Sequence, residues 1–344
     1  MKTLFSNCHA MKSRVHSLIY LAALPLTVGL AACAAPQPNA NAQTVAPAAA
    51  PQITPKTLRV YFVGNSVTDT IRYESLQKLA ESRGHKHVSG RHMIPGAPLD
   101  WIWTHGDGGF QNEPFGHYPK ALPGFAWDAI SLQPFDRQID GDTEHIGKYI
   151  ALARQNPENA QTQFYIYARW PRMSKNGKGV EYDKNNFGKD GDDPKKITDY
   201  STIDAWDKLW SAKYTGGWDN TNEGADYFES LTRAVQKAHP KLEKPVVMVP
   251  VGHAMAALDK KMQAGQVPGF KNIWDVYADG IHLNKVGAYI VACTYYATLY
   301  KESPVGLSGE PYAVTDSKLA STIQETVWEV VKSHPLAGIA TAEK

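Results

Sequence analysis

The chain has few cysteines, little excess charge and no internal repeat. Only 3 of its 344 residues are cysteine, so the dense disulfide framework of a small secreted domain is not indicated. The formal net charge is +2 and the basic residues do not cluster, which argues against a nucleic-acid-binding protein. What remains is the composition of an ordinary globular protein, long enough for one large domain or two small ones.

Two common site motifs are also missing after the first apolar strand. A dinucleotide-binding fold would place Gly-x-Gly-x-x-Gly there, and the strand instead runs into Gly64-Asn65-Ser66-Val67-Thr68. The nucleophile elbow of α/β-hydrolases requires Gly-x-Ser-x-Gly, and Thr68 stands where its last glycine would be. Neither of these sites is therefore expected.

The N-terminus has the features of a targeting segment. A basic start is followed by an apolar run, 18–30, that is too short to span a bilayer comfortably. The run ends in Leu-Ala-Ala-Cys33, which resembles a bacterial lipobox. We expect residues 1–32 to be a lipoprotein signal and Cys33 to carry lipid, which would place the protein in the bacterial periplasm or outer membrane. The alternative is an ordinary signal peptide, cut near Ala32 or after Ala42, and a secreted protein.

Composition divides the rest of the chain into a linker and one domain. Residues 33–55 are rich in Ala and Pro and nearly uncharged, as in a disordered tether. Apolar strands then alternate with amphipathic helices over the predicted domain, 56–340. A polar stretch with several tryptophans, 171–224, interrupts this rhythm and is too long for an ordinary loop. We interpret it as an insertion.

Strand–helix alternation with near-continuous apolar strands predicts an α/β fold. We expect three layers, α/β/α, around a mostly parallel five-stranded sheet, with ligands binding at the carboxyl ends of the strands. The expected strands are 58–63, 87–94, 129–132, 164–167 and 246–251, and the expected helices are 71–83, 145–154, 225–238, 285–300 and 317–331.

Ser66 is a candidate nucleophile because it follows the first strand and a glycine. A serine hydroxyl attacks well only when an adjacent base, held by a third group, accepts its proton. The simpler alternative is that Ser66 or Thr68 caps the next helix, since both residue types are favoured there.

Asp279 and His282 can supply the base and the third group. Their spacing in a turn can bring the carboxylate to Nδ1 of the imidazole and leave Nε2 facing a serine. The simpler alternative is a surface turn before the next helix, with Asn284 as its cap.

Together these motifs resemble the SGNH (GDSL-like) hydrolases, over roughly residues 57–305. Gly64-Asn65-Ser66 matches the block after the first strand, with Asn65 where many members have Asp, and 279–287 matches the block before the last large helix. The resemblance implies an SGNH or flavodoxin-like fold, with Ser66 as nucleophile, His282 as base and acid, and Asp279 as the group that orients the imidazole.

The resemblance also implies an oxyanion hole, in which one position departs from the family. The backbone N–H groups of Ser66 and Gly96 would be two donors. The family's Gly-x-Asn-Asp block is replaced by Ser131-Leu132-Gln133-Pro134. Gln133 carries an amide and could supply the third donor; the alternative is that it only pairs with backbone at the strand end.

Aromatic and polar residues near the expected site loops are candidate substrate contacts. Flat rings with polar neighbours suit sugars, although most of the tryptophans could instead pack the insertion onto the domain. The candidate substrate-binding residues are Asn65, Trp101, Trp103, Arg169 and Trp170.

We expect no metal or other cofactor. The residues His85, His87 and His92 are close in sequence, but a polar turn that leads into a strand explains them more simply. The acidic run 183–193 lacks the glutamate that ends a calcium-binding loop.

The resemblance implies an esterase that removes acetyl or other small acyl groups from a polysaccharide or oligosaccharide. Its only membrane contact would be the lipid anchor. Two alternatives stay open: a lipid-directed acyl hydrolase or thioesterase, and a lipid-anchored glycan-binding protein whose triad is vestigial.

Overall fold

A computed structural model describes residues 54–173, 203–216 and 223–339. These residues belong to one compact unit, Gln52–Lys344. The predicted signal 1–32, Cys33, nearly all of the linker and most of the predicted insertion lie outside the described residues. In the part that is described, no helix has both the length and the apolar character needed to cross a membrane.

A six-stranded sheet forms the centre of the domain, in the order β3-β2-β1-β4-β5-β6. Five strands are parallel, as the sequence predicts, and β3 adds a short antiparallel edge. The α/β fold class is therefore confirmed. The strands are β1 Thr57–Gly64, β2 Lys86–Met93, β3 Phe110–Gln111, β4 Ala129–Leu132, β5 Gln163–Tyr167 and β6 Val247–Val249.

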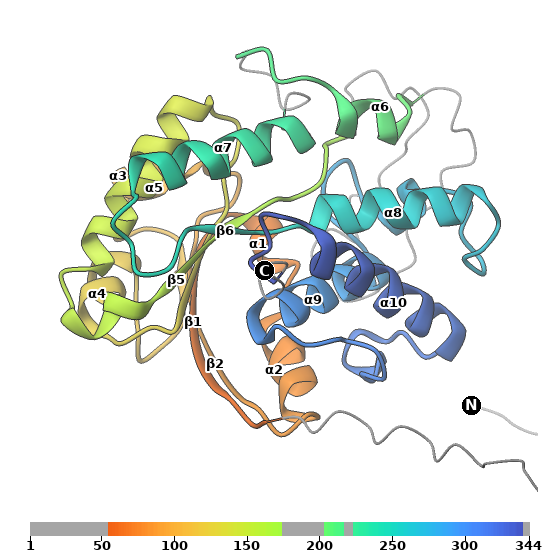
Figure 1. Ribbon diagram of the computed structural model, residues 1–344, viewed down its shortest axis with the longest axis horizontal. Coiled ribbons are helices and arrows are strands. Elements are labelled where there is room, and N and C mark those ends of the chain that lie inside the picture. Colours follow the sequence, from red (N-terminus) through yellow and green to blue (C-terminus); the bar gives the residue numbers. More distant parts are fainter. Residues whose placement is uncertain (1–53, 174–202, 217–222, 340–344) are drawn as a thin grey trace, which may run out of the picture. The chain divides into compact units, whose positions relative to one another are not determined.

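Helices cover both faces of the sheet (Figure 1). One layer contains α3 Leu99–Thr104, α4 Tyr118–Gly124, α5 Ile139–Ala153 and α7 Ala225–Ala238, which pack on one another. The other contains α2 Tyr73–Glu81, α8 Val251–Gln263, α9 Lys285–Tyr300 and α10 Ser317–Ser333. The two remaining α-helices of the described residues are α1 Ser66–Asp69 and α6 Trp206–Ser211, and three 3-10 helices also occur: Pro157–Gln161, Ile273–Val276 and Glu310–Tyr312.

Burial explains why these segments form these elements. The last five residues of β1 are fully buried, as expected for a central parallel strand covered on both faces. From Val286 to Tyr300, every residue of α9 is buried, which fits a helix that is apolar on all sides. The β1 strand and α9 thus form the core that holds the two sequence motifs.

Buried histidines make the stability of this fold sensitive to acid. Burial lowers the pKa of His87, His92 and His334 to about 4, so all three are neutral in the folded protein at pH 6. In the unfolded chain they would bind protons below about pH 6.5. Asp142 has the opposite effect on stability. Burial raises its pKa to about 7, so as the pH falls the folded state binds this proton before the unfolded chain does.

We expect the free energy of unfolding to fall as the pH drops from 6.5 towards 4. Between these values the unfolded chain binds more protons, and the three histidine protons less the one of Asp142 correspond to at most about 3 kcal/mol per pH unit. Urea unfolding at pH 7, 6 and 5 measures this slope. A constant unfolding free energy over that range would contradict the assignment of neutral buried histidines.

Candidate active site

Ser66, His282 and Asp279 form a continuous hydrogen-bonded chain. The Ser66 Oγ lies 2.8 Å from Nε2 of His282, and Nδ1 of the same ring lies 2.7 Å from Oδ2 of Asp279. Ser66 begins α1 directly after β1, whereas Asp279 and His282 lie on the loop before α9. The structure thus brings together the three residues that the sequence suggested, in the order a serine nucleophile requires.

The loop that carries Asp279 and His282 is closed by its own backbone. Ala278 N donates to His282 O at 2.8 Å, and Tyr277 forms an antiparallel bridge with Leu283. Asn284 then caps α9 by accepting from Val286 N and Gly287 N. The helix cap and the Asp–His pair therefore occur together in this loop and are not alternatives.

Hydrogen bonds keep Asp279 ionised in a partly buried setting. Burial by itself would raise the pKa of this carboxyl group. The imidazole of His282 and the backbone N–H groups of Ile281 and His282 donate to it and outweigh burial, so its pKa lies below the usual range. A charged Asp279 can fix the imidazole tautomer and stabilise the imidazolium that forms when Ser66 gives up its proton.

Asn65 shapes the turn that presents Ser66. Its side-chain oxygen accepts from Val67 N, so Asn65, and not Ser66 or Thr68, caps α1. Its Nδ2 donates to Ala97 O at 3.1 Å. The side chain is fully buried. This corrects its expected role as a substrate contact: Asn65 ties the nucleophile's turn to the loop after β2, and the hydroxyl of Ser66 is left for His282.

Gln133 holds the same turn from the β4 side. Its Oε1 accepts from Asn65 N and Thr68 Oγ1, at 3.0 and 2.8 Å, and its Nε2 donates to Pro134 O. Gly64 must be glycine here, because a Cβ would lie 2.8 Å from the Cβ of Gln133 and closer still to Thr68 Oγ1. The backbone pairing suggested as the simpler role is therefore present, and the oxyanion role of Gln133 stays a prediction.

Gly96 lies on the exposed loop after β2 with φ of +67°, a backbone conformation that favours glycine. Among the described residues, neither its N–H nor that of Ser66 donates to another protein group. The loop is joined to the turn of Ser66 through the Asn65–Ala97 hydrogen bond. Both N–H groups are thus available for the oxyanion that the resemblance implies.

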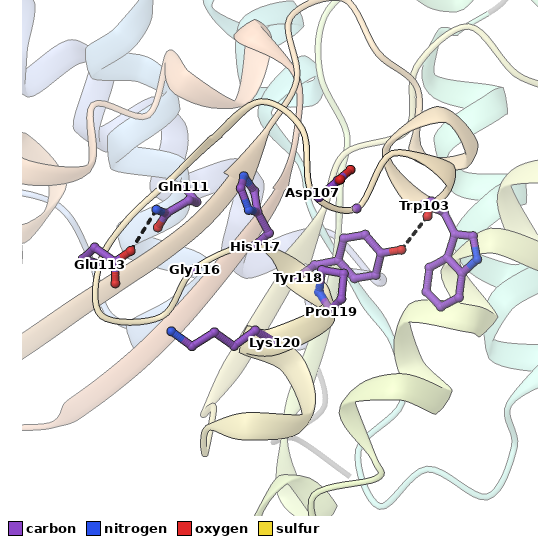
Figure 2. A pocket seen from close by; sticks show the side chains of 10 residues that line it. Trp103, Asp107, Gln111, Glu113, Gly116, His117, Tyr118, Pro119 and Lys120 are labelled. Carbon is purple, nitrogen blue, oxygen red and sulfur yellow. Dashed lines mark hydrogen bonds between the residues drawn. The ribbon is translucent and has the colours of Figure 1, made fainter.

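Trp101 and Trp103 project differently from α3. The Trp101 ring is 51% exposed and stacks on His105 at 4.1 Å between ring centroids. Trp103 packs on Tyr118 and Tyr149. It also lines a pocket of about 600 Å³ between α3, β3 and α4, where its carbonyl accepts from Tyr118 OH (Figure 2). No triad residue lines that pocket, whereas the Trp101 ring is half exposed to solvent.

Arg169 and Trp170 are fully buried, which corrects their expected role as substrate contacts. Arg169 forms an ion pair with Glu223, itself 2% exposed, and burial lowers its pKa to about 10. Trp170 donates its indole N–H to Ile281 O at 2.6 Å, inside the loop that carries Asp279 and His282. Both residues follow β5. Trp170 supports the loop before α9 directly, and Arg169 supports Trp170 by donating to its carbonyl.

Two tryptophans of the predicted insertion also pack into the domain. Trp206 donates to Tyr277 OH at 2.7 Å, and Trp210 stacks on Trp206. A Cβ on Gly252 would collide with the Trp210 ring, so α8 and α6 meet in close contact. Trp218 lies outside the described residues. The packing alternative suggested by the sequence thus holds for Trp206 and Trp210.

Three side chains away from the triad bring possible metal ligands together: Glu229, His253 and His334. However, Nδ1 of His334 accepts from Leu336 N at 3.2 Å, so the proton of the neutral ring is on Nε2, the nitrogen that faces Glu229. A metal ligand would need that nitrogen bare. The cluster therefore fits a hydrogen-bonded contact between helices better than a metal site.

The three histidines that are close in sequence do not converge. His85 stacks on Tyr300, and His87 hydrogen-bonds the hydroxyl of the same tyrosine at 2.8 Å. His92 instead donates to Gly108 O at 2.7 Å. Each ring therefore has a local structural contact.

Comparison with known proteins supports the fold. No family model and no curated protein matches the chain. A solved DUF4886 family protein from Bacteroides uniformis ATCC 8492 is similar, with a TM-score of 0.50 and 16% identity over 80% of this chain and 95% of that one. Another solved structure that is similar is that of "a putative SGNH hydrolase" from Slackia heliotrinireducens. Its TM-score is 0.35, with 16% identity over 69% of this chain and 96% of that one. At 16% identity the likeness to the DUF4886 family protein concerns the fold alone.

Proposed function

We propose that this protein is a serine esterase that removes acetyl or similar small acyl groups from a carbohydrate. The observation that carries the proposal is the Ser66–His282–Asp279 chain, with hydrogen bonds of 2.8 and 2.7 Å. In the first step, Nε2 of His282 takes the proton of Ser66 as Oγ attacks the ester carbonyl. The imidazolium then gives that proton to the leaving sugar oxygen, and an acyl-enzyme remains on Ser66.

Water completes the reaction by the same route. His282 takes a proton from the water molecule that attacks the acyl-enzyme and returns it to Ser66 Oγ, which releases the carboxylic acid. The N–H groups of Ser66 and Gly96 would stabilise the oxyanion in both steps. The residues of this mechanism supply its acid, base and nucleophile, and the proposal includes no cofactor.

The surface of the described residues favours a polar substrate over a lipid. Among the described residues only three large hydrophobic side chains are exposed: Trp101, Phe110 and Val305. Phe110 pairs with Met93, which pairs with Gly64 at the carboxyl end of β1. An enzyme working at a lipid surface would need a larger apolar patch. The separate rings of Trp101 and Phe110 on a polar surface instead suit sugars.

We expect acetate release from acetylated polysaccharides, with kcat/KM on p-nitrophenyl acetate about tenfold or more above that on p-nitrophenyl octanoate. The reason is the small apolar surface available to a long chain, since each added methylene can contribute binding only where it is buried. Initial rates across the acyl series, with acetate quantified for each polysaccharide, measure this. A preference for the octanoyl ester would instead support the lipid-directed hydrolase or thioesterase.

Trp101→Ala separates sugar recognition from ester chemistry in the same assay. We expect a higher KM for polysaccharide and unchanged turnover of p-nitrophenyl acetate, because the exposed ring would contact the sugar and not the acyl group. Trp103→Phe is the matched control, since Trp103 packs against the domain.

The anchored location proposed from the N-terminus would place this activity at the cell surface. Labelling of cells with palmitate, followed by mass spectrometry of the N-terminus, tests whether Cys33 carries lipid. A mature chain that begins after Ala42 would instead support an ordinary secreted esterase.

A further inference from the structure

The segment that follows β5 is attached to the loop of the triad by three hydrogen bonds. We call this segment, Ala168–Met173, the β5 extension. Its Trp170 Nε1 donates to Ile281 O at 2.6 Å, and Met173 N donates to Gly280 O at 2.8 Å. In the opposite direction, Tyr277 OH donates to Pro171 O at 2.8 Å.

Two of these bonds reach the very peptide groups that hold Asp279. The N–H of Ile281 and the N–H of His282 both donate to Asp279 Oδ1, at 2.8 and 2.7 Å. The carbonyl groups of the same two peptide units are those of Gly280 and Ile281. Each peptide unit is therefore hydrogen-bonded at both ends, to the β5 extension through its carbonyl and to Asp279 through its N–H.

We propose that Trp170 is a positioning residue that fixes the carboxylate of Asp279 through the Ile281–His282 peptide. The inference rests on the proposed function, in which Asp279 orients His282. With Oδ1 held by two N–H groups, Oδ2 is the oxygen left to accept from Nδ1 of the imidazole. Hydrogen bonds in such a chain polarise one another, so the bond to the carbonyl strengthens the one that its N–H makes to Asp279.

The surroundings of Trp170 suit a rigid support. The side chain is fully buried, and its ring makes an edge contact with that of Tyr167. Arg169 Nη1 donates to the carbonyl of Trp170 at 2.6 Å, while the Arg169 guanidinium is paired with buried Glu223. The indole is thus held on its backbone side as well as by its ring, so its N–H keeps a fixed direction.

Trp170→Phe tests the proposal, because it keeps a buried ring and removes only the N–H donor and part of the ring volume. Trp127→Phe is the matched control. Trp127 is also buried and donates its indole N–H to a backbone carbonyl, that of Ala121, at 2.9 Å, but it lies at the amino end of β4. The assay is turnover of p-nitrophenyl acetate, with circular dichroism and melting temperature measured for both variants.

We expect Trp170→Phe to lower kcat on the order of 10- to 100-fold with little change in KM, the size of effect that follows loss of the hydrogen-bond partner behind a metal ligand. Trp127→Phe should keep the kcat of the unmodified protein. A Trp170→Phe variant that folds and turns over as fast as Trp127→Phe would overturn the inference and leave the esterase proposal intact. Absence of turnover in the unmodified protein would count against the proposed function itself.

A measurement on the unmodified chain avoids any loss of folding. In protein labelled with ¹⁵N at its indole groups, reaction of Ser66 with a fluorophosphonate changes the charge distribution at His282 and Asp279. We expect the N–H resonance of Trp170 to shift and that of Trp127 to stay in place. Equal shifts for the two indoles would contradict a connection between Trp170 and Asp279.

Discussion

Ser66→Ala is expected to lower kcat for ester hydrolysis by on the order of 10⁴- to 10⁶-fold. The variant retains the N–H groups that would bind the oxyanion but loses the atom that forms the acyl-enzyme, and the remaining triad members cannot act alone. His282→Ala should lose a similar amount, since the two residues act as one unit. Hydrolysis of p-nitrophenyl acetate, with acetate release from polysaccharide as a second assay, measures the change.

The structure predicts that Ser66→Ala leaves the fold intact. The Ser66 Oγ is hydrogen-bonded to His282, whereas the cap of α1 is supplied by Asn65. Ser75→Ala is a matched control: that hydroxyl donates to Pro311 O at 2.9 Å on the surface of α2. Both variants should keep the circular dichroism of the unmodified protein, and only Ser66→Ala should lose turnover.

Covalent labelling distinguishes a slow enzyme from a glycan-binding protein whose triad is no longer catalytic. A fluorophosphonate should add to Ser66 and to no other serine, because only an activated hydroxyl reacts readily. Mass spectrometry of the labelled peptide identifies the site. An unlabelled Ser66 in a folded protein that binds polysaccharide would support the glycan-binding alternative, and Ser66→Ala with substantial remaining turnover would exclude Ser66 as the nucleophile.

The sequence predicted best those helices along which the apolar pattern is unbroken. Two helices, Ala225–Ala238 and Lys285–Tyr300, begin and end at the expected residues, because a regular apolar pattern runs along each. The sequence analysis missed α8, Val251–Gln263, which begins two residues after β6 ends and was partly included in the predicted strand. The residues at this boundary, Val249, Pro250 and Val251, are all apolar, so no change of pattern marks where the strand ends and the helix begins.

In the site, the structure brings together the candidate reacting groups that the sequence indicated, whereas two residues expected to contact substrate are buried supports. Ser66, Asp279 and His282 have the placement along the chain that the proposed reaction requires. Arg169 and Trp170 were expected to bind substrate because they follow a parallel strand at its carboxyl end. Their burial depends on Glu223 and on the loop before α9, which are distant in the chain, and no local pattern reveals those partners. The one feature of the sequence that hinted at this burial was the number of tryptophans near the insertion, more than substrate binding alone would need.

Glu223→Ala is expected to destabilise the fold by about 3–5 kcal/mol, because it leaves the Arg169 guanidinium buried without its partner. Glu223 also accepts from Asp136 N at 2.8 Å, and Asp136 has φ of +54°, so the loop after β4 would lose a constraint as well. Urea unfolding at pH 7 measures the change. Glu144→Gln, which breaks an exposed ion pair with Lys148, is the control and should have little effect.

The double variant Arg169→Met/Glu223→Met distinguishes loss of the pair from loss of packing. Removing both charges avoids an unpaired buried ion, so this variant should be more stable than Glu223→Ala and near the unmodified protein. Its kcat should nevertheless fall, because Arg169 also donates to the carbonyl of Trp170 in the β5 extension. Full stability with reduced kcat, the expected result, would show that Arg169 supports the geometry of the site. If the double variant were as unstable as Glu223→Ala, packing and not charge would account for the loss.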